Sequence, residues 1–137
     1  MGRNKVVLSL LLLLLTTLFT TSMAQKSNGR GLYAFGYATC LGDSVAYITG
    51  IQYLDSATVN KKTGFMEHRE YYARQMEKAL ASQYVGKHYT CALFFSKDKS
   101  KLEKQYTDLR KSLNRDKGVV VDEKAVATFR FVPVVER

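Results

Sequence analysis

Apolar and polar positions alternate with a period of two near the start of the regular part of the chain. Within Leu32–Cys40, aromatic side chains alternate with alanine and glycine, and the aromatic positions are Tyr33, Phe35 and Tyr37. This alternation is typical of a β-strand. Leu41–Asp43 supplies turn residues, and Ser44–Tyr53 continues the alternation with Val45, Tyr47, Thr49, Ile51 and Tyr53. The pattern predicts an antiparallel hairpin with these five residues on one face of its second strand.

Two later segments have a helical period. In Phe65–Val85, apolar residues recur three and four positions apart, and Gly86 follows as a left-handed stop. A second helix is predicted from its narrow apolar stripe of Leu102, Tyr106, Leu109 and Leu113. Ser96 or Ser100 is the expected N-cap of that helix, and Asn114–Gly118 ends it.

The remaining apolar runs predict strands. His88–Phe95 is apolar on both faces, so it is expected to be central in the sheet. Val119–Val121 and Ala125–Phe131 flank a tight turn and read as a short strand and a last strand. The resulting order is β-β-α-β-α-β(β). We expect an α+β two-layer sandwich, with a mixed sheet of four to five strands and both helices on one face.

The N-terminal 24 residues have the order of a secretory signal. Arg3 and Lys5 precede an apolar stretch, Val6–Phe19, and Ser22 and Ala24 place small residues before the expected cleavage point. A retained anchor is the alternative, but the apolar stretch has 14 residues, whereas a membrane span needs roughly 18. The prediction is therefore a signal peptide at 1–24, a flexible segment at 25–31 and a single domain at 32–137. The protein is expected to be exported, either periplasmic or secreted.

Export changes how charge and cysteines are interpreted. The whole chain has a net charge of +9, and removal of Arg3 and Lys5 leaves +7. Nucleic acid is not an expected partner, because an exported protein seldom meets it, and no membrane span is expected after cleavage. Cys40 and Cys91 are candidates for a disulfide in an oxidising compartment, and two buried free thiols are the equal alternative.

The catalytic and metal motifs of the sequence are weak. Gly42-Asp43-Ser44 resembles the Gly-Asp-Ser block of serine esterases, which makes Ser44 the nucleophile of an alternative small-hydrolase hypothesis. The same triplet is ordinary turn chemistry. His68 and His88 have no further ligands at metal-binding spacing. We therefore expect no catalytic residue, no metal and no cofactor.

Two features suit binding. Lys97–Lys117 contains eight basic and four acidic residues, and its candidate contacts to an anionic surface are Lys97, Lys101, Lys104, Arg110 and Lys111. A solvated helix face, on which the interspersed acids pair with the bases, is the alternative. The aromatic row Tyr33, Phe35 and Tyr37 is a candidate for stacking on sugars, with packing beneath a helix as the alternative. The leading hypothesis is an exported non-enzymatic binding module. Its expected partner is an anionic or glycan polymer of the cell envelope or another exported protein.

The overall layout of signal, aromatic hairpin, helix, cysteine-bearing strand and basic helix resembles small exported proteins of Gram-negative bacteria that have no assigned function. More locally, His88–Leu113 resembles the strand and helix of sporulation-related-repeat domains. That resemblance implies binding of peptidoglycan glycan strands on a sheet surface. The family's element order differs from the hairpin-first order predicted here, and it usually has a glycine where this chain has Phe94-Phe95. No binding residue is therefore carried over.

Overall fold

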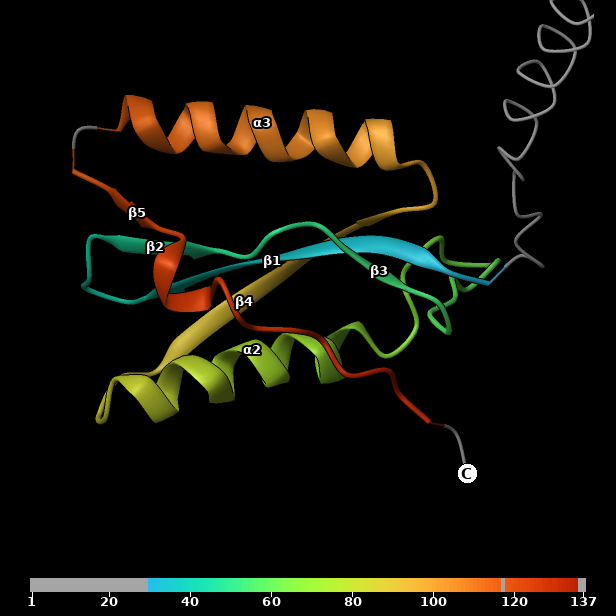
Figure 1. Ribbon diagram of the computed structural model, residues 1–137, viewed down its shortest axis with the longest axis horizontal. Coiled ribbons are helices and arrows are strands. Elements are labelled where there is room, and N and C mark those ends of the chain that lie inside the picture. The colour runs from blue at the N-terminus through green and yellow to red at the C-terminus, as the bar shows by residue number, and fades with distance from the viewer. Residues whose placement is uncertain (1–29, 117, 136–137) are drawn as a thin grey trace, which may run out of the picture.

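Residues 30–116 and 118–135 are described in this computed structural model, and the signal predicted at 1–24 lies outside them. They form a five-stranded mixed sheet with helices, which confirms the α+β class (Figure 1). The elements are β1 (Leu32–Cys40), β2 (Val45–Ile48), β3 (Gln52–Leu54), α2 (Arg69–Gln83), β4 (Tyr89–Ser96), α3 (Lys99–Arg115), β5 (Val120–Asp122) and a 3-10 turn, η2 (Lys124–Val126).

The long strand β1 is the centre of the sheet. β4 pairs antiparallel along one side of β1, and β2 and β3 share its other side. β5 continues the sheet beyond β2 in parallel. The expectation that His88–Phe95 is central is therefore wrong, because β4 pairs with β1 alone. Both faces of β4 are apolar because helices cover this strand on both sides.

The predicted second strand of the hairpin is divided by a β-bulge. Between the pairs Leu32–Leu54 and Tyr37–Ile48, β1 advances five residues while the facing chain advances six. One extra residue reverses the alternation of side chains beyond the bulge. Tyr47 therefore packs on the α2 side of the sheet, whereas Tyr53 pairs with Tyr33 on the α3 side. The single face predicted for Val45–Tyr53 is thus wrong.

The two helices lie on opposite faces of the sheet, not on one (Figure 1). Leu32, Ala34 and Ala38 of β1 join the core cluster that contains Met76 and Leu80 of α2. Phe35 and Ile48 join the cluster of Leu102 on α3. The architecture has three layers because both faces of β1 and β4 are apolar and each requires a cover.

Local chemistry sets the ends of the helices. α2 begins at Arg69, later than the predicted Phe65, because His68 adopts a left-handed conformation with φ 56° and ψ 21°. Gly86 follows α2 with φ 83°, as its sequence position predicts. The N-cap of α3 is Asp98 and not a serine, since its carboxylate accepts hydrogen bonds from the amides of Ser100 and Lys101 at 2.9 and 3.4 Å.

The C-terminal segment is not the strand predicted at Ala125–Phe131. It forms η2 and then an extended segment on the α2 face, where Val126 and Phe131 are buried in the core. Glutamine side chains bond the main-chain groups of this segment that a neighbouring strand would otherwise bond. The amide of Gln52 donates to the carbonyl of Phe129 at 3.1 Å and accepts from the amide of Phe131 at 2.9 Å. Gln75 makes the corresponding pair of bonds to Val132 at 2.9 and 2.7 Å.

Candidate functional site

The aromatic row of β1 lies beneath α3. Phe35 is fully buried, stacked on Phe94 with ring centres 4.8 Å apart and meeting Tyr106 of α3 edge-on at 5.0 Å. Tyr33 and Tyr37 are half-buried in the same cluster. The row is therefore part of the core, because α3 covers the sheet face that the sugar-stacking interpretation requires to be open. The opposite face is covered by α2 and the C-terminal segment.

Both cysteines are free thiols. Ala38 is directly opposite Cys91 and Cys40 is directly opposite Tyr89, so the two cysteines are diagonal neighbours on β1 and β4. The Sγ of Cys91 contacts the Sδ of Met76 at 3.4 Å beneath α2. Burial, with a smaller contribution from the nearby charge of Glu77, raises the pKa of the Cys91 thiol to about 12. Cys91 is thus a protonated packing residue in this fold.

Alkylation of the native protein at pH 8 is expected to modify Cys40 and leave Cys91 intact. Only the thiolate is nucleophilic, and a thiol with a pKa of about 12 is ionised in about one molecule in ten thousand at that pH. Peptide mass mapping after iodoacetamide treatment measures this. Unfolding in denaturant without reductant is the control and should expose both thiols. If neither cysteine is labelled in denaturant until a reductant is added, the two residues form a disulfide and the free-thiol structure is wrong.

The Gly42-Asp43-Ser44 triplet forms a turn. The amide of Asp43 donates to the carbonyl of Cys40 at 3.0 Å, and Gly42 has a φ of 82°. Asp43 forms an ion pair with Lys87 at 2.5 Å, and the hydrogen bond from Lys87 lowers the pKa of its carboxyl. The aspartate of this triplet thus holds β4 to the hairpin, with a lysine as its charged partner.

A cleft of about 530 Å³ lies at the other end of β1, where Arg30, Ala57 and His68 are among its lining residues. The nine residues of β1 span about 26 Å, so this histidine and the Ser44 turn are at opposite ends of the sheet. Glu67 accepts a short hydrogen bond from the hydroxyl of Thr58. The Tyr72 hydroxyl accepts a hydrogen bond of 3.2 Å from the amide of Val134. These polar groups hold the cleft walls together. Among the described residues no group of three or more histidine, cysteine and acidic side chains is placed to hold a metal.

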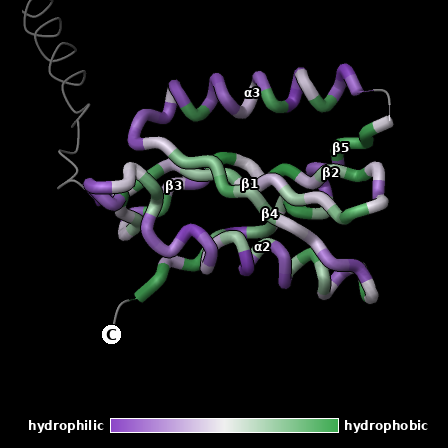
Figure 2. Tube along the Cα trace, turned by 180° about the vertical axis from the view of Figure 1, so that it is seen from behind, coloured by the Kyte–Doolittle hydropathy of each residue, from purple (hydrophilic) through white to green (hydrophobic). Residues whose placement is uncertain are grey.

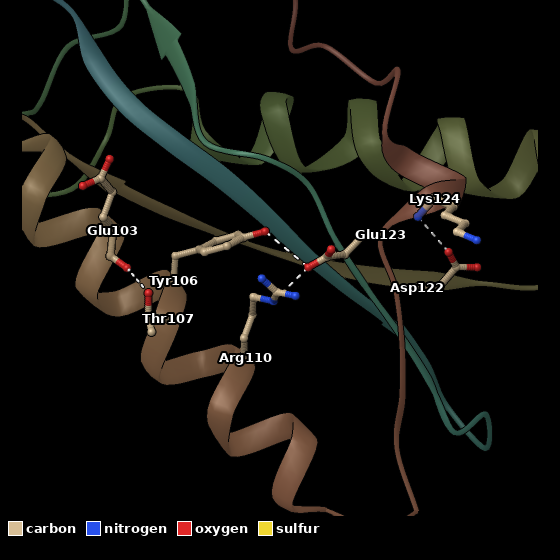
Figure 3. Close-up of polar contacts among 7 residues, drawn as sticks. All are labelled: Glu103, Tyr106, Thr107, Arg110, Asp122, Glu123 and Lys124. Atoms are coloured by element: carbon tan, nitrogen blue, oxygen red, sulfur yellow. Dashed lines mark hydrogen bonds and ion pairs between the residues drawn. The ribbon is translucent and has the colours of Figure 1, made fainter.

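Where the structure describes them, some cations of the basic segment form ion pairs within the fold and others do not. Arg110 forms an ion pair with Glu123 at 2.9 Å and lies over the ring of Tyr106, so it fastens α3 to the turn after β5 (Figure 3). Lys99 pairs with Glu103 one turn further along α3. Arg110 therefore makes structural contacts within the fold.

Four cations of α3 point away from the sheet. Lys101, Lys104, Lys111 and Arg115 are exposed, and with Asp108 they are spaced three, four, three and four residues apart. This spacing places them on one side of a helix, opposite the apolar stripe that packs on the sheet. We call this set of four residues the basic face. Lys97 is exposed just before the helix begins. Arg115 belongs to the basic segment Lys97–Lys117 singled out from the sequence, and its spacing from Lys111 places it on this side of the helix.

None of the four cations of the basic face forms an ion pair with any other residue in the described part of the chain. They extend over fifteen residues of helix, a rise of about 21 Å. Figure 2 shows α3 as mostly hydrophilic, with short hydrophobic stretches recurring along it. The result is a continuous positive surface with a single acid, Asp108, within it.

These features define the protein as a small basic α+β domain with a mixed sheet between two helices. Neither of those helices, as far as the chain is described, has the length and apolar character to cross a bilayer. Comparison with models of known families, with curated proteins and with solved structures found no match.

Proposed function

We propose that the protein is an exported, non-enzymatic module that binds an anionic polymer of the cell envelope through the basic face of α3. The observation that carries this proposal is the set of four exposed cations that form no ion pair within residues 30–116 and 118–135. A cation that no acid of the fold neutralises is available to an external anion. The expected export signal at residues 1–24 places such a module among envelope polymers.

The shape of the basic face favours an extended partner. Its length of about 21 Å is suited to a chain with repeated negative groups rather than to one small anion. The side chains are long and solvated, so the attraction is mainly Coulombic and weakens as salt is added. Because α3 covers the aromatic row, the contact does not depend on stacking against the sheet.

Binding to dextran sulfate, measured by fluorescence anisotropy of the labelled polymer, tests the proposal. We expect saturable binding that weakens with added salt, and no binding to uncharged dextran of the same length. The double reversal Lys104→Glu and Lys111→Glu should weaken binding about tenfold or more, because each change replaces an attraction by a repulsion.

The matched control is Lys61→Glu with Lys62→Glu, which alters net charge equally in an exposed loop away from α3. This control should retain most of the affinity. Equal loss in both variants would mean that net charge, not the basic face, governs binding, and would overturn the proposal. Binding to vesicles of anionic lipid but not to the polymer would assign the face to a membrane surface instead.

A further inference from the structure

The outer edge of β4 presents main-chain groups without a strand partner. Both main-chain groups of Gly36 on β1 bond to Thr49, at 2.9 and 3.0 Å, so Gly36 faces β2 and β3. Because main-chain groups alternate in direction along a strand, those of Phe35 and Tyr37 face β4. Their partners in β4 face β1 in return, and the intervening residues of β4 face outward. The outward residues are Tyr89, Cys91, Leu93 and Phe95.

One hydrogen bond confirms this direction. The amide of Cys91 donates to the carboxylate of Glu77 on α2 at 3.1 Å, outside the sheet. The amides of Leu93 and Phe95 bond to no described residue beyond the sheet ladder. A groove of about 290 Å³ follows this edge, and it is lined by Arg69, Glu70, Ala73, Cys91, Ala92 and Leu93.

Edges of this kind usually carry a protecting feature such as a lysine, a proline or a bulge. β4 has eight residues, none of which is charged or proline, and its pairing with β1 is continuous. Glu77 satisfies only one of its outward amides. An uncharged edge of this length readily accepts another strand.

We propose that β4 pairs antiparallel with β4 of a second copy, about a two-fold axis beside Ala92. In that register Tyr89 is opposite Phe95 of the second copy, and Cys91 is opposite Leu93, so every outward residue of both strands has a partner. Glu77 gives up its bond to Cys91 as the second strand takes its place. The sheets of the two copies become one.

The residues beside the edge suit a second copy. Ala92 is small and exposed, so two such residues fit face to face at the axis. On the α2 side, the groove holds the short side chain of Ala73 with one base and one acid, Arg69 and Glu70. A surface that carries both charges is complementary to itself when a two-fold axis reverses it. In this dimer both basic faces of α3 lie on the same side of the joined sheet.

Ala92→Cys in the full chain tests the register. Residues directly opposite in a non-hydrogen-bonded antiparallel pair have Cα atoms about 4.5 Å apart, which is within disulfide range. We expect rapid formation of a covalent dimer under mild oxidation. Thr90→Cys is the matched control, because it lies exposed on the same strand but would be about 13 Å from its copy. Equal cross-linking of both variants would overturn the register.

Light scattering and sedimentation test the dimer itself. The wild-type protein should be dimeric at high concentration, and Ala92→Lys should be monomeric, since it places two like charges face to face. Its melting temperature should match that of the wild-type protein diluted until it is monomeric. Mixing Ala92→Lys with Ala92→Glu should restore a mixed dimer. Val120→Lys on exposed β5 is the control and should remain dimeric. A wild-type protein that is monomeric at every concentration, or one that stays monomeric and binds an added extended peptide along β4, would overturn the proposal.

Discussion

Replacement of Phe35 by alanine is expected to lower the free energy of unfolding by about 3–5 kcal/mol. The ring is fully buried and contacts β4 through Phe94 and α3 through Tyr106. Its removal leaves a cavity at the point where these two elements meet β1. Domains of this size have a total stability of about 5–15 kcal/mol, so the loss is a large part of the whole. Denaturant titration followed by circular dichroism measures it.

Two further substitutions serve as controls for the effect of Phe35→Ala on stability. Phe35→Leu retains most of the apolar volume and should cost less than Phe35→Ala. Val120→Ala changes an exposed apolar residue of β5 and should alter stability by less than about 0.5 kcal/mol. If Phe35→Ala were no more disruptive than Val120→Ala, the aromatic row would not pack under α3. That result would favour the interpretation of Tyr33, Phe35 and Tyr37 as an exposed stacking surface.

Replacement of Gln52 by leucine is the second large effect, with an expected loss of about 2–4 kcal/mol. The side-chain amide bonds both the carbonyl of Phe129 and the amide of Phe131 in a partly buried place. Leucine has a similar size but leaves both main-chain groups without a partner, at about 1–3 kcal/mol each. Thermal and denaturant unfolding measure the change, and proteolysis should release the C-terminal segment earlier.

Gln75→Leu is the matched control, because Gln75 makes the same pair of bonds to Val132 at an exposed site. Water replaces those bonds when the side chain is removed, so the cost should be below about 1 kcal/mol. A similar loss from both substitutions would contradict the role assigned to burial. Gln52→Glu should be intermediate, because the carboxylate still accepts from the amide of Phe131 but cannot donate to the carbonyl of Phe129.

Periodicity in the sequence was enough to locate most elements. Regular alternation placed β1, and a spacing of three and four residues placed α2 and α3, because these periods follow from backbone geometry alone. The glycine after α2 was also correctly interpreted, since its φ of 83° is a local property. The sequence thus predicted the α+β class and the apolar stripe of α3.

Tertiary structure decided where those elements went. A single inserted residue opposite β1 separated Tyr47 from Tyr53, and no alternation pattern reveals a bulge of that kind. The Ala125–Phe131 segment has strand-forming residues, but glutamine side chains took the bonds that a neighbouring strand would have made. An apolar run shows that a segment is covered without showing by what, which is why β4 was expected at the centre.

For the candidate site too, the sequence predicted one part and the tertiary structure decided the rest. Sequence alone located the basic segment, because charge is a property of composition, and it supplied the expected export signal. Only the fold separated Arg110, which is bound to Glu123, from the unpaired cations of the basic face. Likewise, only the fold placed Phe35 under α3, since a strand has two equivalent faces until a helix packs on one of them. Pairing and packing join residues far apart in the chain, and no local pattern records them.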